Sequence, residues 1–64
     1  MNGAVREFDE AKGLGVIAGD DDRDFPFHCI EIADGTRTVD AGRAVTFRLL
    51  PRFGAFQAGA IEKR

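Results

Sequence analysis

The chain has 64 residues, of which nine are Lys or Arg and eleven are Asp or Glu, so its formal net charge is −2. A chain of this length has room for one domain, which we expect to span residues 1–64 and to bury only about 60% of the surface exposed by the unfolded chain. The modest negative charge argues against binding of polyanions by bulk electrostatics alone. One cysteine and one histidine exclude an intrachain disulfide and a Cys/His metal cluster.

The charges are distributed unevenly along the chain. Residues 1–35 carry a net charge of −6, and the remaining residues carry a net charge of +4. Such a split can place basic groups on one side of a domain, or the two halves can interleave so that their charges cancel. No segment resembles a signal peptide or approaches the roughly 18 to 20 apolar residues that span a bilayer. We therefore expect a soluble cytoplasmic protein, without a cofactor, metal or membrane partner.

Short apolar runs separated by turns rich in Gly, Asp and Pro predict an all-β fold. At this length a five-stranded antiparallel barrel of the OB type is the natural way to close such strands. We expect strands near residues 3–9, 14–19, 24–30, 43–50 and 55–62.

The second expected strand contains Gly13 and Gly15 on either side of Leu14, where glycine allows tight packing or a strong bend. The segment DDDRD at residues 20–24 predicts a hairpin connection to the next strand. A calcium site is an alternative for this segment, but the spacing lacks an EF-hand pattern. We therefore interpret residues 20–24 as a structural turn.

The third and fourth expected strands alternate between apolar and other residues. Phe25 and Phe27 should point into the core, and Pro26 should lie at an edge, a bulge or an irregularity, because proline has no N–H to donate. In the fourth strand, one face consists of residues that we expect in the core, namely Val45, Phe47 and Leu49.

Three segments follow one another in a distinctive order: KGLGVI at residues 12–17, FPFHC at residues 25–29, and TRTVDAGRAVTF at residues 36–47. Together they resemble bacterial cold-shock proteins, and the resemblance covers essentially the whole chain. The first two segments are similar to the two nucleic-acid-binding strands of that family. The resemblance implies a five-stranded OB-type barrel that binds single-stranded RNA or DNA.

The resemblance also shows where this chain departs from the family, which presents exposed rings for base stacking, each stack contributing about 1–3 kcal/mol. Most of those ring positions hold non-aromatic residues here, so we expect a steep loss of affinity at the usual site, with added repulsion from Glu7. The positions are Glu7, Leu14, Val16, Pro26, Cys29 and Thr36.

The resemblance implies that part of the contact set is retained. Each of these residues also has a purely structural explanation. Phe8 can be a core or rim residue, Arg6 and Lys12 can be solvated charges, and His28 can be an ordinary surface histidine. Phe53 and Phe56 are either replacement rings beside the old face or a cover for the end of the barrel. The full candidate nucleic-acid-binding set is Arg6, Phe8, Lys12, Leu14, Val16, Pro26, His28, Phe53, Phe56 and Gln57.

Two functions follow from these residues. The first is weak or altered binding of single-stranded RNA or DNA, in an RNA-chaperone or regulatory role. The second is a protein-interaction module, with a protein partner or a second copy docking on an aliphatic patch of Leu14, Val16, Pro26 and Cys29. We expect no enzyme, because His28 is adjacent to Cys29 and should point to the opposite strand face, which leaves the thiol without a base.

Overall fold

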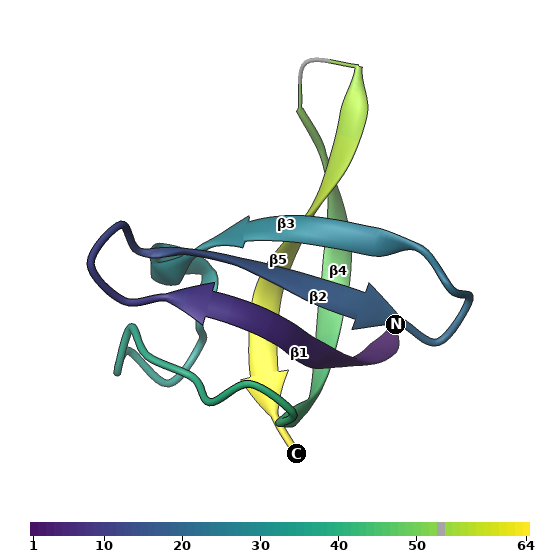
Figure 1. Ribbon diagram of the computed structural model, residues 1–64. Coiled ribbons are helices and arrows are strands. Elements are labelled where there is room, and N and C mark those ends of the chain that lie inside the picture. The colour runs from purple at the N-terminus through teal and green to yellow at the C-terminus, as the bar shows by residue number, and fades with distance from the viewer. Residues whose placement is uncertain (53) are drawn as a thin grey trace.

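The computed structural model describes residues 1–52 and 54–64 and contains five strands and one short 3₁₀-helix (Figure 1). This confirms the predicted all-β class. The elements are β1 (Asn2–Asp9), β2 (Leu14–Gly19), β3 (Asp24–His28), η1 (Cys29–Glu31), β4 (Ala44–Arg52) and β5 (Ala55–Lys63).

The strands form one antiparallel sheet in the order β3-β2-β1-β4-β5. β1, β2 and β3 run across β4 and β5, so the sheet curls over itself (Figure 1). The two end strands, β3 and β5, pack against each other, and a parallel bridge joins Ile32 to Ile61. The sheet is therefore barrel-like without a continuous hydrogen-bonded ladder around it, as in the expected OB-type fold.

Two bulges bend the sheet. In β1 the register with β2 shifts between Val5 and Glu7, which leaves Arg6 as the extra residue. In β5 the register with β4 shifts next to Ala60, whose φ of 48° lies in the left-handed region. The N–H of Ala60 donates to Oε1 of Glu31 at 3.2 Å, so η1 satisfies the backbone group that the bulge releases.

The barrel interior is filled by aliphatic and aromatic side chains. Phe25 and Phe47 pack with ring centroids 5.4 Å apart, and Leu49 packs against the core while remaining partly exposed. The inward placement of Phe25 and Phe27 is confirmed, as is that of Val45 and Phe47. The buried core is Val5, Ile17, Phe25, Phe27, Ile32, Val39, Val45, Phe47, Ala58 and Ile61.

Pro26 lies in β3, at one end of the strand order, which confirms its expected place at an edge. The expected extension of that strand to residue 30 is wrong. Beyond His28 the chain turns into η1, and the N–H of Ile32 donates to the carbonyl of Cys29 at 3.2 Å. The strand ends there because local turn bonds replace the ladder.

β4 and β5 are longer than expected, and their connecting end projects from the body (Figure 1). Pro51 and Arg52 pair with Phe56 and Ala55 in this hairpin. β1 pairs with β4 only at residues 44–46, so Pro51 has no ladder partner to lose on its other side. This explains how a proline is accommodated within a strand.

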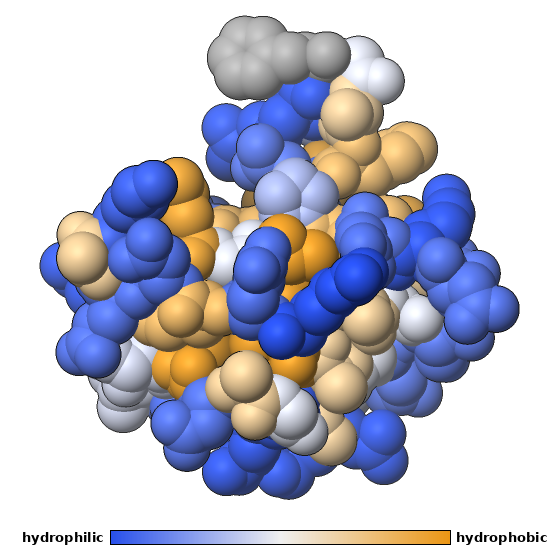
Figure 2. Space-filling model, in the orientation of Figure 1, coloured by the Kyte–Doolittle hydropathy of each residue, from blue (hydrophilic) through white to orange (hydrophobic). Residues whose placement is uncertain are grey.

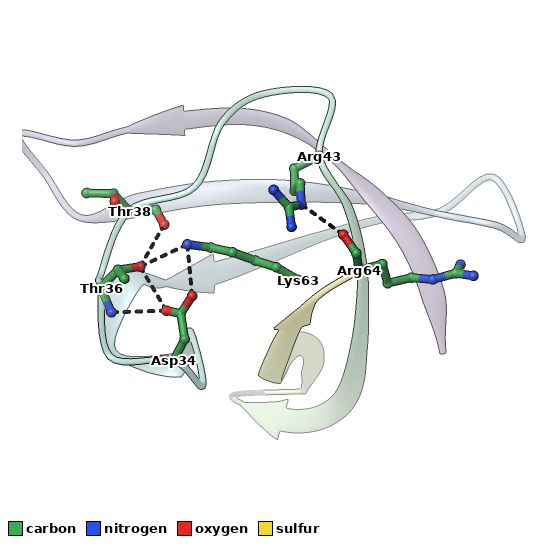
Figure 3. Close-up of polar contacts among 6 residues, drawn as sticks. All are labelled: Asp34, Thr36, Thr38, Arg43, Lys63 and Arg64. Carbon is green, nitrogen blue, oxygen red and sulfur yellow. Dashed lines mark hydrogen bonds and ion pairs between the residues drawn. The ribbon is translucent and has the colours of Figure 1, made fainter.

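The loop from residue 32 to residue 43 is held against the end of β5 (Figure 3). The Nζ of Lys63 lies 3.0 Å from Oδ2 of Asp34 and donates to Oγ1 of Thr36 at 2.9 Å. The N–H of Thr36 also donates to Oδ1 of Asp34 at 3.0 Å. Thr36, a position that is aromatic in the resembled family, is thus engaged in fixing this loop.

Candidate functional site

Two rows of side chains form the exposed face of β1, β2 and β3, which we call the outer face. Directly paired residues of neighbouring strands lie on the same face of a sheet. These residues are exposed or half-buried, whereas the row between them, Phe8–Gly15–Phe27, is directed toward the core. The two outer rows are Glu7–Val16–Pro26 and Asp9–Leu14–His28.

A depression of about 440 Å³ opens at these strands. In the space-filling view, apolar side chains gather on the body of the molecule among charged ones (Figure 2). Five of the predicted site residues line the depression: Phe8, Lys12, Leu14, Val16 and Pro26. The other lining residues are Glu7, Asp9, Gly15 and Phe27.

The aromatic part of the depression is a stacked pair. The rings of Phe8 and Phe27 lie nearly parallel, with an interplanar angle of 7° and centroids 5.9 Å apart. Gly15, paired with both residues, makes this possible: a Cβ there would lie 2.5 Å from Cζ of Phe27. Phe27 is almost fully buried, so the half-buried ring of Phe8 is the aromatic surface that a ligand in the depression meets.

The cations of the candidate set have different surroundings. Lys12 lies in the β1–β2 turn, where its backbone N–H donates to Oδ1 of Asp9 at 3.2 Å, and it lines the depression. Gly13 completes the turn with φ of 68°. Arg6, at the bulge, forms an ion pair with Asp24 and does not line the depression. Because this pair is exposed, it contributes little to stability and leaves Arg6 only weakly held.

His28 lies on the outer face, directly opposite Leu14, but outside the depression. Its Nδ1 accepts the N–H of Ile30 at 3.4 Å and lies 3.8 Å from Sγ of Cys29. The expectation that His28 and Cys29 point to opposite strand faces is therefore wrong, because β3 ends at His28 and Cys29 belongs to η1. The ring of His28 serves as the cap of this turn.

Two predicted residues of the last hairpin, Phe56 and Gln57, do not line the depression. Phe56 pairs with Pro51 on the projecting part of β5, and 50% of its surface is exposed. Gln57 pairs with Leu50 and is half-buried. Phe53 lies outside the described residues. Phe56 thus presents half of its surface to solvent in the β4–β5 hairpin and is not among the residues that line the depression.

The electrostatic character of the depression is acidic, since two carboxylates and one ammonium line it. The sequence reasoning identified Glu7 as a source of repulsion but missed Asp9. The alternation of Glu7, Phe8 and Asp9 in an expected strand already placed both acids on one face. The missing information was the pairing of Asp9 with Leu14, which brings that carboxylate beside the predicted site.

Two carboxyl groups outside the depression, those of Asp34 and Asp21, have lowered pKa values. The N–H and hydroxyl of Thr36 and the ammonium of Lys63 lower the pKa of Asp34 from 3.8 to about 2 (Figure 3). The side chain of Arg23 lowers the pKa of Asp21, in the β2–β3 turn. Both carboxylates are held in their charged form by hydrogen bonds, which fits a structural role in their loops.

Within residues 1–52 and 54–64, no group of three or more His, Cys, Asp or Glu side chains is arranged to hold a metal ion. No helix in the described part of the chain has the length and apolar character needed to cross a membrane.

Comparison with known proteins agrees with this geometry. Residues 1–63 match the family described as the 'Cold-shock' DNA-binding domain. The sequence is 43% identical over 47 residues to "Cold shock protein 2" of Lactiplantibacillus plantarum (strain ATCC BAA-793 / NCIMB 8826 / WCFS1). It has the same identity over the same length to "Cold shock protein 1" of that organism. Each match covers 72% of this chain and 71% of the relative.

Proposed function

The chain belongs to the cold-shock domain family, and from that premise we propose that it binds single-stranded RNA or DNA on its outer face. The observation that carries the proposal is the depression itself, where Phe8, Lys12 and the aliphatic residues of β2 meet on an exposed surface. A ring for one base and a cation for a phosphate are the two elements that a single-strand site needs.

Binding is weak in this proposal because stacking is reduced. Each base–aromatic stack contributes about 1–3 kcal/mol, and Phe8 supplies the accessible ring in the depression. Leu14 and Val16 contribute apolar contact without a π-face. Glu7 and Asp9 oppose the approach of phosphates, and only Lys12 attracts them there. The loss of rings and the added charge act in the same direction.

The biological role that fits such a site is that of an RNA chaperone or a regulator, which binds and releases single strands without a catalytic step. We place this activity in the cytoplasm and assign it to one domain formed by residues 1–64. Base preference differs from that of relatives with an aromatic face, because different groups line the site.

Fluorescence anisotropy of a labelled pyrimidine-rich heptamer tests the proposal directly. At about 50 mM salt we expect saturable binding, and at about 200 mM salt a markedly weaker affinity, because phosphate contacts release counterions. Absence of binding at the lower salt concentration would refute the proposal. The label belongs on the nucleic acid, since the protein contains neither Trp nor Tyr.

A second candidate function is supported by the exposed aliphatic side chains of the same face. Leu14 is 49% exposed and lies between Asp9 and His28, and Pro26 is exposed in the next row. Such a patch fits a protein partner or a second copy of the chain. An aliphatic contact is insensitive to salt or slightly strengthened by it, unlike a phosphate contact. Sedimentation at rising protein concentration and salt distinguishes the two functions.

A further inference from the structure

The carboxylates of Glu7 and Asp9 bear on which bases the depression accepts. Both residues are exposed, lie two positions apart in β1, and line the depression together with the ring of Phe8. A base bound in the depression would therefore lie beside acidic groups. This arrangement differs from a purely apolar platform, which tolerates every base.

The two carboxylates are not equally available to a ligand. Oδ1 of Asp9 already accepts the backbone N–H of Lys12 at 3.2 Å, which holds Asp9 in the turn. For Glu7, no hydrogen bond or ion pair to its carboxylate occurs in residues 1–52 and 54–64. Glu7 is thus the acceptor with two uncommitted oxygens, and Asp9 is the second, more rigid one.

A carboxylate can only accept hydrogen bonds, so it discriminates between base edges. Cytosine, adenine and guanine each carry an exocyclic amino group that donates, whereas uracil and thymine have no amino group, present the O4 acceptor, and keep the ring N3–H as their one donor. In a single strand these edges are unpaired and accessible. A donor facing Glu7 forms a charge-assisted bond, while O4 facing it is repelled.

Lys12 is the cation among the lining residues, and its ammonium is a donor that would favour O4 if it faced the base. It lies in the turn at the end of β1, where a phosphate of the strand can be reached instead. Among the charged side chains that line the depression, the two carboxylates, which accept hydrogen bonds, outnumber the one ammonium, which donates them.

We propose that the outer face selects bases with an exocyclic amino group over uracil and thymine, with Glu7 as the main selecting residue and Asp9 in support. The inference rests on the proposed function, because it concerns the same site. It assigns a base class to that site from the acidic groups that replace part of the ring platform.

The test compares heptacytidylate and heptauridylate, which differ in the group at ring position 4 and in the proton on N3, each carrying the same 5′ fluorophore. At about 50 mM salt and neutral pH we expect heptacytidylate to bind about 5-fold more tightly or better, the ratio that one well-placed base contact provides. In Glu7→Gln the ratio should fall toward one, because an amide both donates and accepts. The affinity of that variant for heptauridylate should rise.

Glu62→Gln is the matched control, because Glu62 is an exposed glutamate of β5 that does not line the depression. It removes the same charge and should leave the ratio unchanged. Equal or tighter binding of heptauridylate by the natural chain would overturn the inference and leave the proposed function intact. A ratio that survives Glu7→Gln would overturn the assignment to Glu7. Binding of neither oligomer would instead refute the proposed function, and the inference with it.

Discussion

Replacing Leu14 with phenylalanine restores a ring at the outer face and should tighten binding of a pyrimidine-rich single strand. Leu14 lies opposite Asp9 and His28 and is 49% exposed, so a ring there faces a base without entering the core. One base–aromatic stack contributes about 1–3 kcal/mol, which is roughly 5-fold to 150-fold in Kd. Val16→Phe should give less, because Val16 is half-buried and part of its ring would face protein.

The control is Leu14→Met, which keeps a flexible apolar side chain of similar volume but has no π-face. Both variants and the natural chain are titrated into the same labelled heptamer, and their folded fractions are compared by urea denaturation. A gain for Leu14→Phe that does not exceed that of Leu14→Met would contradict the reasoning. It would mean that bases do not stack where β2 presents this side chain.

Three further predictions concern single residues. Lys12→Ala should weaken binding to all sequences alike and reduce the slope of log K against log salt by about 0.7 if Lys12 neutralises one phosphate; a changed base preference would show that Lys12 reads bases instead. Ala60→Gly should raise the free energy of unfolding by roughly 0.5–1 kcal/mol, because removing the left-handed strain of about 1–2 kcal/mol outweighs the entropy cost of glycine. In the same urea experiment Ala55→Gly, a strand residue outside that region, should lose about 0.5–1 kcal/mol, and equal effects of the two substitutions would exclude strain at Ala60. The pKa of Asp34 is lowered in the folded state to about 2, so the stability that its carboxylate contributes is complete above about pH 4 and is lost as the pH falls through 2. Asp34→Asn should therefore make the urea midpoint less dependent on pH over that range. An unchanged pH profile would show that the hydrogen bonds of Thr36 and Lys63 to Asp34 do not persist in solution.

The strand pattern was readable from the sequence because burial follows residue type at period two. Phe25 and Phe27 alternate with exposed residues, and so do Val45 and Phe47, so their inward placement needed no knowledge of distant contacts. The bulge at Ala60 was not readable in this way. Its position depends on the pairing of β4 with β5 and on the N–H bond to Glu31, neither of which is a local property of the sequence.

The end of the third strand shows the same limit. The alternation of Phe25 to Cys29 is compatible with a longer strand, and only the turn bonds around His28 end it two residues earlier than expected. The resemblance to cold-shock proteins identified five of the nine residues that line the depression as site residues. It did not identify Asp9, because the resemblance concerns the aromatic positions of this face and says nothing of the acidic residues beside them.

The most direct test of the account is an NMR titration of ¹⁵N-labelled protein with a cytosine-containing pyrimidine heptamer at about 50 mM salt, where phosphate contacts are strongest. We expect saturable amide shifts concentrated on Phe8, Lys12, Leu14, Val16 and the neighbours of Pro26, which has no amide proton of its own. Saturable shifts confined to β4 and β5 would contradict the placement of the site on the outer face. No shifts at high ligand excess would contradict nucleic-acid binding by this chain.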